Sequence, residues 1–134
     1  YIRMYLDEKI QKKIFKKIYN KEQISNWVEK LINENNNNYV MIEKGSDLFL
    51  GNIELVIKND IAELMLSIVP NMQNQHYGTE AIKATLDFCK EKFNIEKYEL
   101  FVYKNNLNAI RCYENIGFKI DGNGISQDDV HMKL

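Results

Sequence analysis

The sequence contains little cysteine, proline or glycine, and these shortages exclude several classes of protein. Of its 134 residues, two are cysteine, one is proline and six are glycine. Cys89 and Cys112 lie far apart and form no CxxC pair, so we expect neither a disulfide framework nor a structural zinc site. Both are interpreted as free thiols of the core, where unpaired cysteine usually lies.

Glycine-rich nucleotide motifs and metal-ligand patterns are also missing. Neither GxGxxG nor GxxxxGK[ST] occurs, which argues against a dinucleotide oxidoreductase and against a P-loop NTPase. His76 and His131 are the only histidines, and neither has acidic or thiol neighbours at metal-ligand spacing. We therefore expect no metal site.

Long apolar runs and an excess of one charge are absent too. No stretch approaches the ~18 consecutive apolar residues of a membrane span, and lysines interrupt residues 1–20, where a signal peptide would need an apolar core. The formal net charge is -1, so bulk charge indicates no polyanionic partner. These observations predict a cytoplasmic protein with no membrane partner.

The composition that remains is typical of one globular domain. Apolar residues make up 45% of the chain and charged residues 28%, which is not the composition of a disordered protein. The length is that of one ordinary domain. Since no Pro- or Ser-rich linker occurs, the asparagine-rich stretch at 33–38 is interpreted as a loop within a single domain of residues 1–134.

Hydrophobic periodicity and turn residues predict an α+β fold. Helices are expected after Asp7 and at 21–34, 78–93 and 107–115, and strands at 1–6, 39–44, 48–57, 61–69, 97–103, 118–121 and 130–134. Short polar turns join the second to fourth strands into an antiparallel meander, and the helix at 78–93 connects two strands as a βαβ unit. The order βααβββαβαββ predicts a mixed, mostly antiparallel sheet flanked by helices.

The first predicted helix carries a row of basic residues, Lys9, Lys12, Lys13, Lys16 and Lys17. Such a face could bind nucleic acid or a membrane surface. An ordinary solvated face is the preferred interpretation, because the opposite face of this helix has a regular apolar stripe. Salt-dependent binding to nucleic acid would distinguish the two, and we expect no nucleic-acid partner.

The stretch "VPNMQNQHYGTEAIKA" at 69–84 ends a predicted strand at Pro70 and opens a helix at Gly78. Residues 74–79 have neutral side chains, and the first turn of a helix exposes backbone N–H groups that no intrahelical acceptor can use. Such a loop could hold a pyrophosphate through its N–H groups. A plain polar connection in which glycine relieves strain is the alternative.

A second stretch, "NNLNAIRCYENIGFK" at 105–119, resembles the N-x-x-A-x-x-x-Y-x-x-x-G-F pattern of the GNAT family of acetyl-CoA-dependent N-acetyltransferases. The residues in register are Asn106, Ala109, Tyr113, Gly117 and Phe118. The segment from Gln73 to Gly78 resembles that family's Q/R-x-x-G-x-G/A loop, with Asn74 and His76 where the family usually has glycine. The element order matches along residues 1–134, and most strongly over 61–119.

The resemblance implies a set of acetyl-CoA contacts. The loop side would contribute Gln73, Asn74, Gln75, His76, Tyr77, Gly78 and Thr79, and the pantetheine arm would pair with the backbone of Ile68 and Val69. Asn106 would hydrogen-bond the cofactor, unless it only caps the following helix. Tyr113 would protonate the departing thiolate as general acid, unless it is a core tyrosine whose hydroxyl is satisfied.

Two glutamates are candidates for the general base. Glu54 and Glu63 alternate with apolar neighbours on adjacent strands, so each could face either solvent or an acceptor cleft. Burial in a cleft would raise a carboxyl pKa toward a useful value. Glu63 is slightly preferred because its strand is the one that would carry the cofactor, and a chain of waters could also accept the proton.

We therefore expect an N-acetyltransferase that moves an acetyl group from acetyl-CoA to a primary amine of a polyamine, an amino sugar or a protein N-terminus. The sequence looks most like the branch that contains spermidine and ribosomal-protein N-terminal acetyltransferases. A non-catalytic module that binds acetyl-CoA or a polyamine as a regulatory ligand is the alternative. The resemblance also makes a homodimer possible, because dimers are common in that family.

Overall fold

The structure, a computed structural model, describes residues 20–33, 37–43, 45–46 and 48–134. The predicted strand at 1–6 and the lysine-bearing helix lie outside these residues. The elements are α3 (Lys21–Asn33), β1 (Asn37–Ile42), β2 (Phe49–Lys58), β3 (Ile61–Ile68), the 3-10 helix η1 (Pro70–Met72), α4 (Tyr77–Phe93), β4 (Lys97–Tyr103), α5 (Leu107–Ile116), β5 (Lys119–Asn123) and β6 (Asp129–Lys133). Every element predicted within these residues is present, with ends shifted by at most a few residues.

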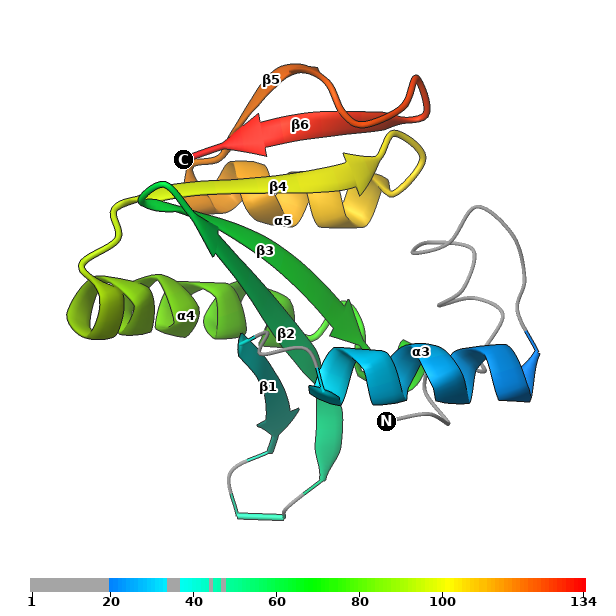
Figure 1. Cartoon of the computed structure of the whole chain (residues 1–134). Coiled ribbons are helices and arrows are strands. Elements are labelled where there is room, and N and C mark those ends of the chain that lie inside the picture. The colour runs from blue at the N-terminus through cyan, green and yellow to red at the C-terminus, as the bar shows by residue number, and fades with distance from the viewer. Residues whose placement is uncertain (1–19, 34–36, 44, 47) are drawn as a thin grey trace.

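The sheet has six strands in the order β1-β2-β3-β4-β6-β5 (Figure 1). β3 and β4 are parallel, and every other neighbouring pair is antiparallel. The parallel pair is connected through α4, as the predicted βαβ unit requires. The predicted mixed, mostly antiparallel sheet is therefore confirmed.

One face of the sheet carries the hydrophobic core. Alternate residues of β2, β3, β4 and β6 pack there against α4 and α5, and the helices contribute Ile82, Cys89 and Tyr113. Cys89, Ala62 and Met132 are 0% exposed, so this layer is fully closed to water. Of the apolar stripe predicted on α3, the structure describes the burial of Ile24, which is 1% exposed.

Local sequence signals explain the turns that shape this core. Asn59 and Asp60, which join β2 to β3, both have positive φ, as tight two-residue hairpins require. Gly117 has a φ of 120° at the end of α5, where its N–H donates to the carbonyls of Tyr113 and Glu114. The chain therefore turns sharply from α5 into β5.

β3 and β4 separate along their length, and this separation creates room for a site. Their register covers only three pairs, from Ile61↔Lys97 to Glu63↔Glu99. Beyond Glu63 the two strands diverge, as Figure 1 shows by the angle between β3 and β4.

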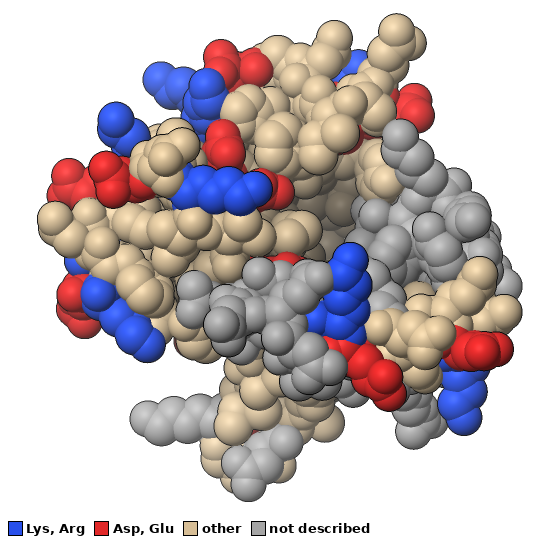
Figure 2. Space-filling view, viewed as in Figure 1, with Lys and Arg blue, Asp and Glu red and all other residues tan. Residues whose placement is uncertain are grey.

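Two further findings bear on partners. No helix within the described residues is long and apolar enough to cross a membrane. Charges of both signs are interspersed on the face of the molecule that Figure 2 shows.

Candidate functional site

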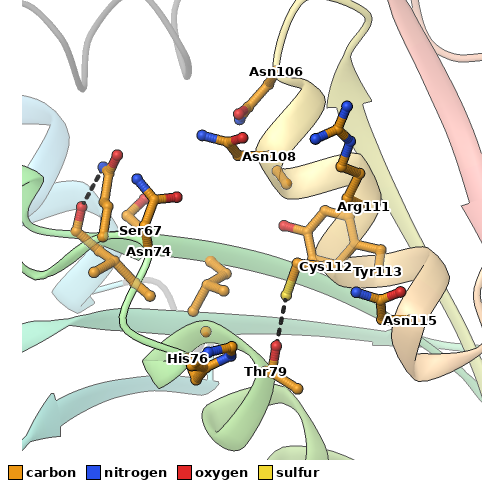
Figure 3. A pocket seen from close by; sticks show the side chains of 15 residues that line it. Ser67, Asn74, His76, Thr79, Asn106, Asn108, Arg111, Cys112, Tyr113 and Asn115 are labelled. Atoms are coloured by element: carbon orange, nitrogen blue, oxygen red, sulfur yellow. Dashed lines mark hydrogen bonds between the residues drawn. The ribbon is translucent and has the colours of Figure 1, made fainter.

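A pocket of about 360 Å³ lies at the open end of β3. Its walls come from the end of β3, the loop after Pro70, the first turn of α4 and one face of α5 (Figure 3). A volume of this size is within the range of small-molecule sites. The residues that line it are Leu66, Ser67, Ile68, Gln73, Asn74, His76, Gly78, Thr79, Asn106, Asn108, Ala109, Arg111, Cys112, Tyr113 and Asn115.

The edge of β3 that borders this pocket has backbone groups directed into the gap left by β4. Val69 N–H donates to the carbonyl of Leu50 in the β2 direction, at 2.9 Å. Because neighbouring residues of a strand direct their backbone groups to opposite sides, those of Leu66 and Ile68 point toward the splayed side. The Ile68 carbonyl already accepts a bond from Gln73 Nε2 at 2.9 Å. The edge can pair with an extended ligand through the groups that remain.

Val69, by contrast, is poorly placed for the backbone contact that the resemblance implies. It does not line the pocket. Its N–H is engaged by β2, and its carbonyl accepts a bond from Met72 N–H at 2.9 Å. The backbone contact of Val69 stays a prediction, and Leu66 and Ile68 are the residues of this edge that line the pocket.

The first turn of α4 opens onto the same pocket. His76 is the N-cap residue, with a φ of 65°, and its side chain makes no capping hydrogen bond. The N–H groups of the first turn therefore remain uncapped by a side chain and carry the partial positive charge of the helix end. An anion such as a phosphate can bind there.

Gly78 allows a ligand to approach this turn closely. A Cβ atom at Gly78 would lie 3.2 Å from Ile68 Cδ1, 3.4 Å from Leu66 Cδ2 and 3.9 Å from Cys112 Sγ. The first of these distances is tighter than ordinary van der Waals contact. The absence of a side chain at Gly78 thus keeps the pocket floor open where β3, α4 and α5 meet.

Two predicted loop contacts point elsewhere. Gln75 Nε2 donates to the carbonyl of Asn71 at 2.9 Å, and the Tyr77 hydroxyl donates to Glu43 Oε1 at 2.8 Å. Neither residue lines the pocket. Tyr77 contributes to the site through its position in the first turn of α4, and Gln75 through its place in the loop.

α5 supplies another wall of the pocket and the hydroxyl of the buried Tyr113. Asn106 is the N-cap residue of α5 but makes no side-chain capping bond, and its side chain lines the pocket. Tyr113 is only 8% exposed, yet its hydroxyl has no hydrogen-bond partner within the described part of the chain. In Figure 3 this hydroxyl points toward the pocket interior. Burial, with a smaller contribution from Cys112, raises the pKa of Tyr113 well above its usual value.

The sequence motifs did not identify six further residues that line the pocket. They are Leu66, Ser67, Asn108, Arg111, Cys112 and Asn115. Asn108, Cys112 and Asn115 follow helical i, i+4, i+7 spacing beside the face that holds Tyr113, so periodicity could have indicated them. Arg111 is the only Lys, Arg, Asp or Glu among the lining residues. Both cysteines are free thiols as predicted: Cys89 is buried in the core, and Cys112 packs against the core while also lining the pocket.

Neither candidate base lines the pocket, and the two lie at different distances from it. Glu54 pairs with Met65 in the β2–β3 ladder and is 6% exposed, so it does not face solvent. It is a diagonal neighbour of Ser67, on the same face of the sheet. Glu63 lies four residues before Ser67, about 13 Å along an extended strand.

Glu63 belongs to a separate charged cluster at the paired end of β3. It stands beside Glu99, whose Oε2 lies 2.8 Å from His131 Nε2. Burial and the Glu99 carboxylate raise the pKa of Glu63, while Lys58 and His131 act in the opposite direction. No group of three or more potential metal ligands occurs within the described residues.

The donor set of the pocket fits acetyl-CoA. The N-terminal end of α4 and Arg111 can bind phosphates. The free edge of β3 can pair with the amides of the extended pantetheine arm, and the Tyr113 hydroxyl can contact the sulfur of the thioester. No carboxylate lines the pocket to repel phosphate.

Comparison with known proteins agrees with this geometry. Residues 1–119 match the acetyltransferase (GNAT) domain family. Spermidine N(1)-acetyltransferase of Escherichia coli K12 is 35% identical over 75 residues, which are 54% of this chain and 40% of that protein. Its counterpart in Vibrio cholerae is 26% identical over 109 residues, 79% of this chain and 63% of that protein. The chain thus spans only part of the curated relatives that it matches.

Solved structures show the same fold. Spermidine N-acetyltransferase from Vibrio cholerae, in complex with CoA and spermine, has a TM-score of 0.81 at 24% identity, covering 99% of this chain and 86% of that one. A GNAT-family acetyltransferase from Bacillus anthracis has a TM-score of 0.82 at 20% identity, covering 99% and 85%. The fold inferred from the sequence motifs is confirmed.

Proposed function

Because the chain belongs to the GNAT family of acetyltransferases, which uses acetyl-CoA, we propose that it transfers an acetyl group from acetyl-CoA to a primary amine of a polyamine. The matched curated relatives that suggest this acceptor are spermidine acetyltransferases. An amino sugar or a protein N-terminus is the next acceptor class to test.

The observation that carries the proposal is the Tyr113 hydroxyl. A buried hydroxyl without a protein partner is costly, so it is retained where a ligand satisfies it. Its raised pKa keeps it protonated at neutral pH, which is the state that a proton donor needs. A thiolate that leaves into the same dry pocket is destabilised by the same burial and accepts a proton more readily.

The proposed reaction is direct transfer. Acetyl-CoA supplies a thioester carbonyl carbon, and the neutral amine nitrogen bonds to that carbon while the C–S bond breaks. The sulfur takes the Tyr113 proton, and the amine nitrogen loses one proton to a base. Leu66 and Ile68 orient the extended arm through their backbone, and the first turn of α4 and Arg111 hold the phosphates.

Glu54 is the carboxylate that we propose as proton acceptor, acting through water. Glu54 lies diagonally across from Ser67, on the sheet face opposite α4. An amine could therefore enter from that face without crossing the phosphate site. The sequence slightly favours Glu63, but Glu63 lies farther along β3 from the pocket. Substitution of each glutamate by glutamine distinguishes the two assignments.

A thiol-release assay with acetyl-CoA tests the proposal. The acceptor panel contains spermidine, spermine, glucosamine, an aminoglycoside and a peptide with a free N-terminus. Turnover with the polyamines above the other acceptors supports the proposal, and turnover confined to another acceptor changes the substrate class. Binding of acetyl-CoA without turnover on any amine would indicate the regulatory module.

A further inference from the structure

The two cysteines occupy opposite environments, although both are free thiols. Cys89 lies in the core, is 0% exposed and has a pKa raised by burial. Cys112 is only partly buried, and its sulfur lines the pocket on α5. Figure 3 shows this sulfur directed toward Thr79 at the start of α4, at 3.2 Å from Thr79 Oγ1. A reagent in the pocket can therefore reach one thiol but not the other.

An independent feature indicates that a ligand occupies the space beside this sulfur. The Tyr113 hydroxyl is more than nine-tenths buried, lacks a partner within the described residues and is aimed into the same pocket. Tyr113 follows Cys112 directly, so their Cα atoms are about 3.8 Å apart. Both residues line the same pocket, so a CoA derivative that binds at Tyr113 occupies the pocket that Cys112 also lines.

We propose that Cys112 is a redox-modification site, at which the disulfide of CoA forms a mixed disulfide with Cys112 Sγ and closes the pocket. The inference rests on the proposed function to the extent that both need this pocket to bind CoA. It adds a regulation of that site: oxidation of the CoA pool would stop acetyl transfer, and a thiol reductant would restore it.

The chemistry is a thiol–disulfide exchange that balances without a further oxidant. Cys112 Sγ loses its proton to water and attacks one sulfur of the CoA disulfide. A new S–S bond forms to Cys112, the original S–S bond breaks, and the second CoA leaves as a thiolate that takes up a proton. Thr79 Oγ1 can donate a hydrogen bond to Sγ during the attack.

Selectivity for CoA would come from the pocket itself. The pocket that would hold acetyl-CoA, phosphates included, would also hold one half of CoA disulfide, which raises the local concentration of that disulfide near Cys112. Glutathione disulfide lacks those phosphates, so it gains no comparable effect. The product leaves the CoA half tethered in the space that acetyl-CoA needs.

The experiment incubates the purified chain with CoA disulfide and, separately, with glutathione disulfide at equal concentration. Intact mass and peptide mapping identify the modified cysteine and its rate. We expect one adduct, on Cys112, that forms at least about tenfold faster with CoA disulfide than with glutathione disulfide. Acetyl-CoA should slow it, and dithiothreitol should remove it.

Variants of the two thiols are the matched controls. Cys112→Ser should form no adduct, while Cys89→Ser should react like the parent chain; circular dichroism verifies that both fold. Where acetyl transfer is measurable, each variant is compared with its own untreated sample, and CoA disulfide should inactivate all but Cys112→Ser.

The outcomes separate this inference from the proposed function. An adduct that acetyl-CoA prevents supports the inference even if no amine is acetylated. Acetyl transfer without a Cys112 adduct overturns the inference alone. Equal rates with both disulfides, no competition by acetyl-CoA, or modification of Cys89 would also overturn it, because the pocket would then play no part.

Discussion

The two ends of β3 differ in pairing and in chemistry. At the first end, Ile61–Glu63 pair with β4, and the carboxylates of Glu63 and Glu99 lie beside His131. At the second end the strand is separated from β4, and the pocket lining contains amides, hydroxyls and one arginine but no carboxylate. The same strand thus joins a closed, charged region to an open region suited to an anionic ligand.

Two buried tyrosines show the same contrast. Tyr98 pairs with Ala62 at the closed end, is 6% exposed, and lies with its hydroxyl oxygen 2.6 Å from the Ile95 carbonyl oxygen. Tyr113 at the open end is 8% exposed and has no such partner within the described residues. The first hydroxyl contributes to the fold, and the second is left for a ligand. The functional part of β3 is therefore its unpaired part.

The largest expected effect tests the difference between Tyr113 and Tyr98. Tyr113→Phe should lower kcat by about 10²–10⁴-fold, the usual contribution of a positioned proton donor. Acetyl-CoA affinity should change little, because the hydroxyl acts mainly as the sulfur leaves. Steady-state thiol release and calorimetric titration measure the two quantities.

Tyr98→Phe is the matched control. It should reduce the free energy of unfolding by about 1 kcal/mol through the lost hydrogen bond, with kcat unchanged. Denaturant titration measures that loss. Equal effects of the two variants on kcat would contradict the assignment of Tyr113.

The second effect compares carboxylates at different distances from the pocket. Glu54→Gln should reduce kcat/KM for the amine by about 10²-fold, and Glu63→Gln should leave it within about twofold, if the proton passes through Glu54. Measuring pH profiles of both variants sharpens the test, since removal of a base also removes its limb of the profile. The reverse ranking would restore Glu63 as the base.

The third effect concerns Gly78, on the floor of the pocket at the open end of β3. Gly78→Val places a branched side chain against Ile68 and Leu66, which should raise the KM for acetyl-CoA about tenfold, or ~1.4 kcal/mol. Ala84→Val, at an exposed position of the same helix, controls for the loss of helix propensity. If both variants raise KM equally, the close approach at Gly78 is not what matters.

The smallest effect lies at the closed end and depends on pH. The raised pKa of Glu63 means that the folded state binds its proton more tightly than the unfolded state. The contribution of Glu63 to stability should therefore fall as pH rises above its unfolded pKa of about 4.3. Glu63→Gln removes this loss, so the stability of the variant relative to wild type should be higher at pH 7 than at pH 4. Urea titrations at both pH values measure the gain, and a gain that is larger at pH 4 would contradict the raised pKa that burial and Glu99 give to Glu63.

Much of the fold could be predicted because the pattern is local. The run "KYELFVY" alternates buried side chains with half-buried or exposed ones and forms β4 with the predicted bounds, and Gly117 ends α5 as expected. The burial of Glu54 is harder to predict. The centre of β2 is buried on both faces, so the alternation of polar and apolar residues there does not mark a solvent-facing side. Burial of that glutamate depends on tertiary packing, which periodicity does not contain.

The site was predictable where a motif fixes a helix face. Asn106 and Tyr113 are seven residues apart on α5 and both line the pocket. Val69, Gln75 and Tyr77 were not, because their contacts depend on ladder register and on hydrogen bonds to distant groups such as Glu43. Sequence reasoning thus located the loop but not the direction of each group within it.

The most direct test of the account is hydrogen exchange of the backbone N–H groups with and without acetyl-CoA. The account predicts slower exchange at Leu66 and Ile68 and in the first turn of α4, since these groups would bind the cofactor. It predicts no change at Ile61–Glu63, which already pair with β4. Protection confined to the closed end, or absent from both ends, would contradict the claim that the open end of β3 is the acetyl-CoA site.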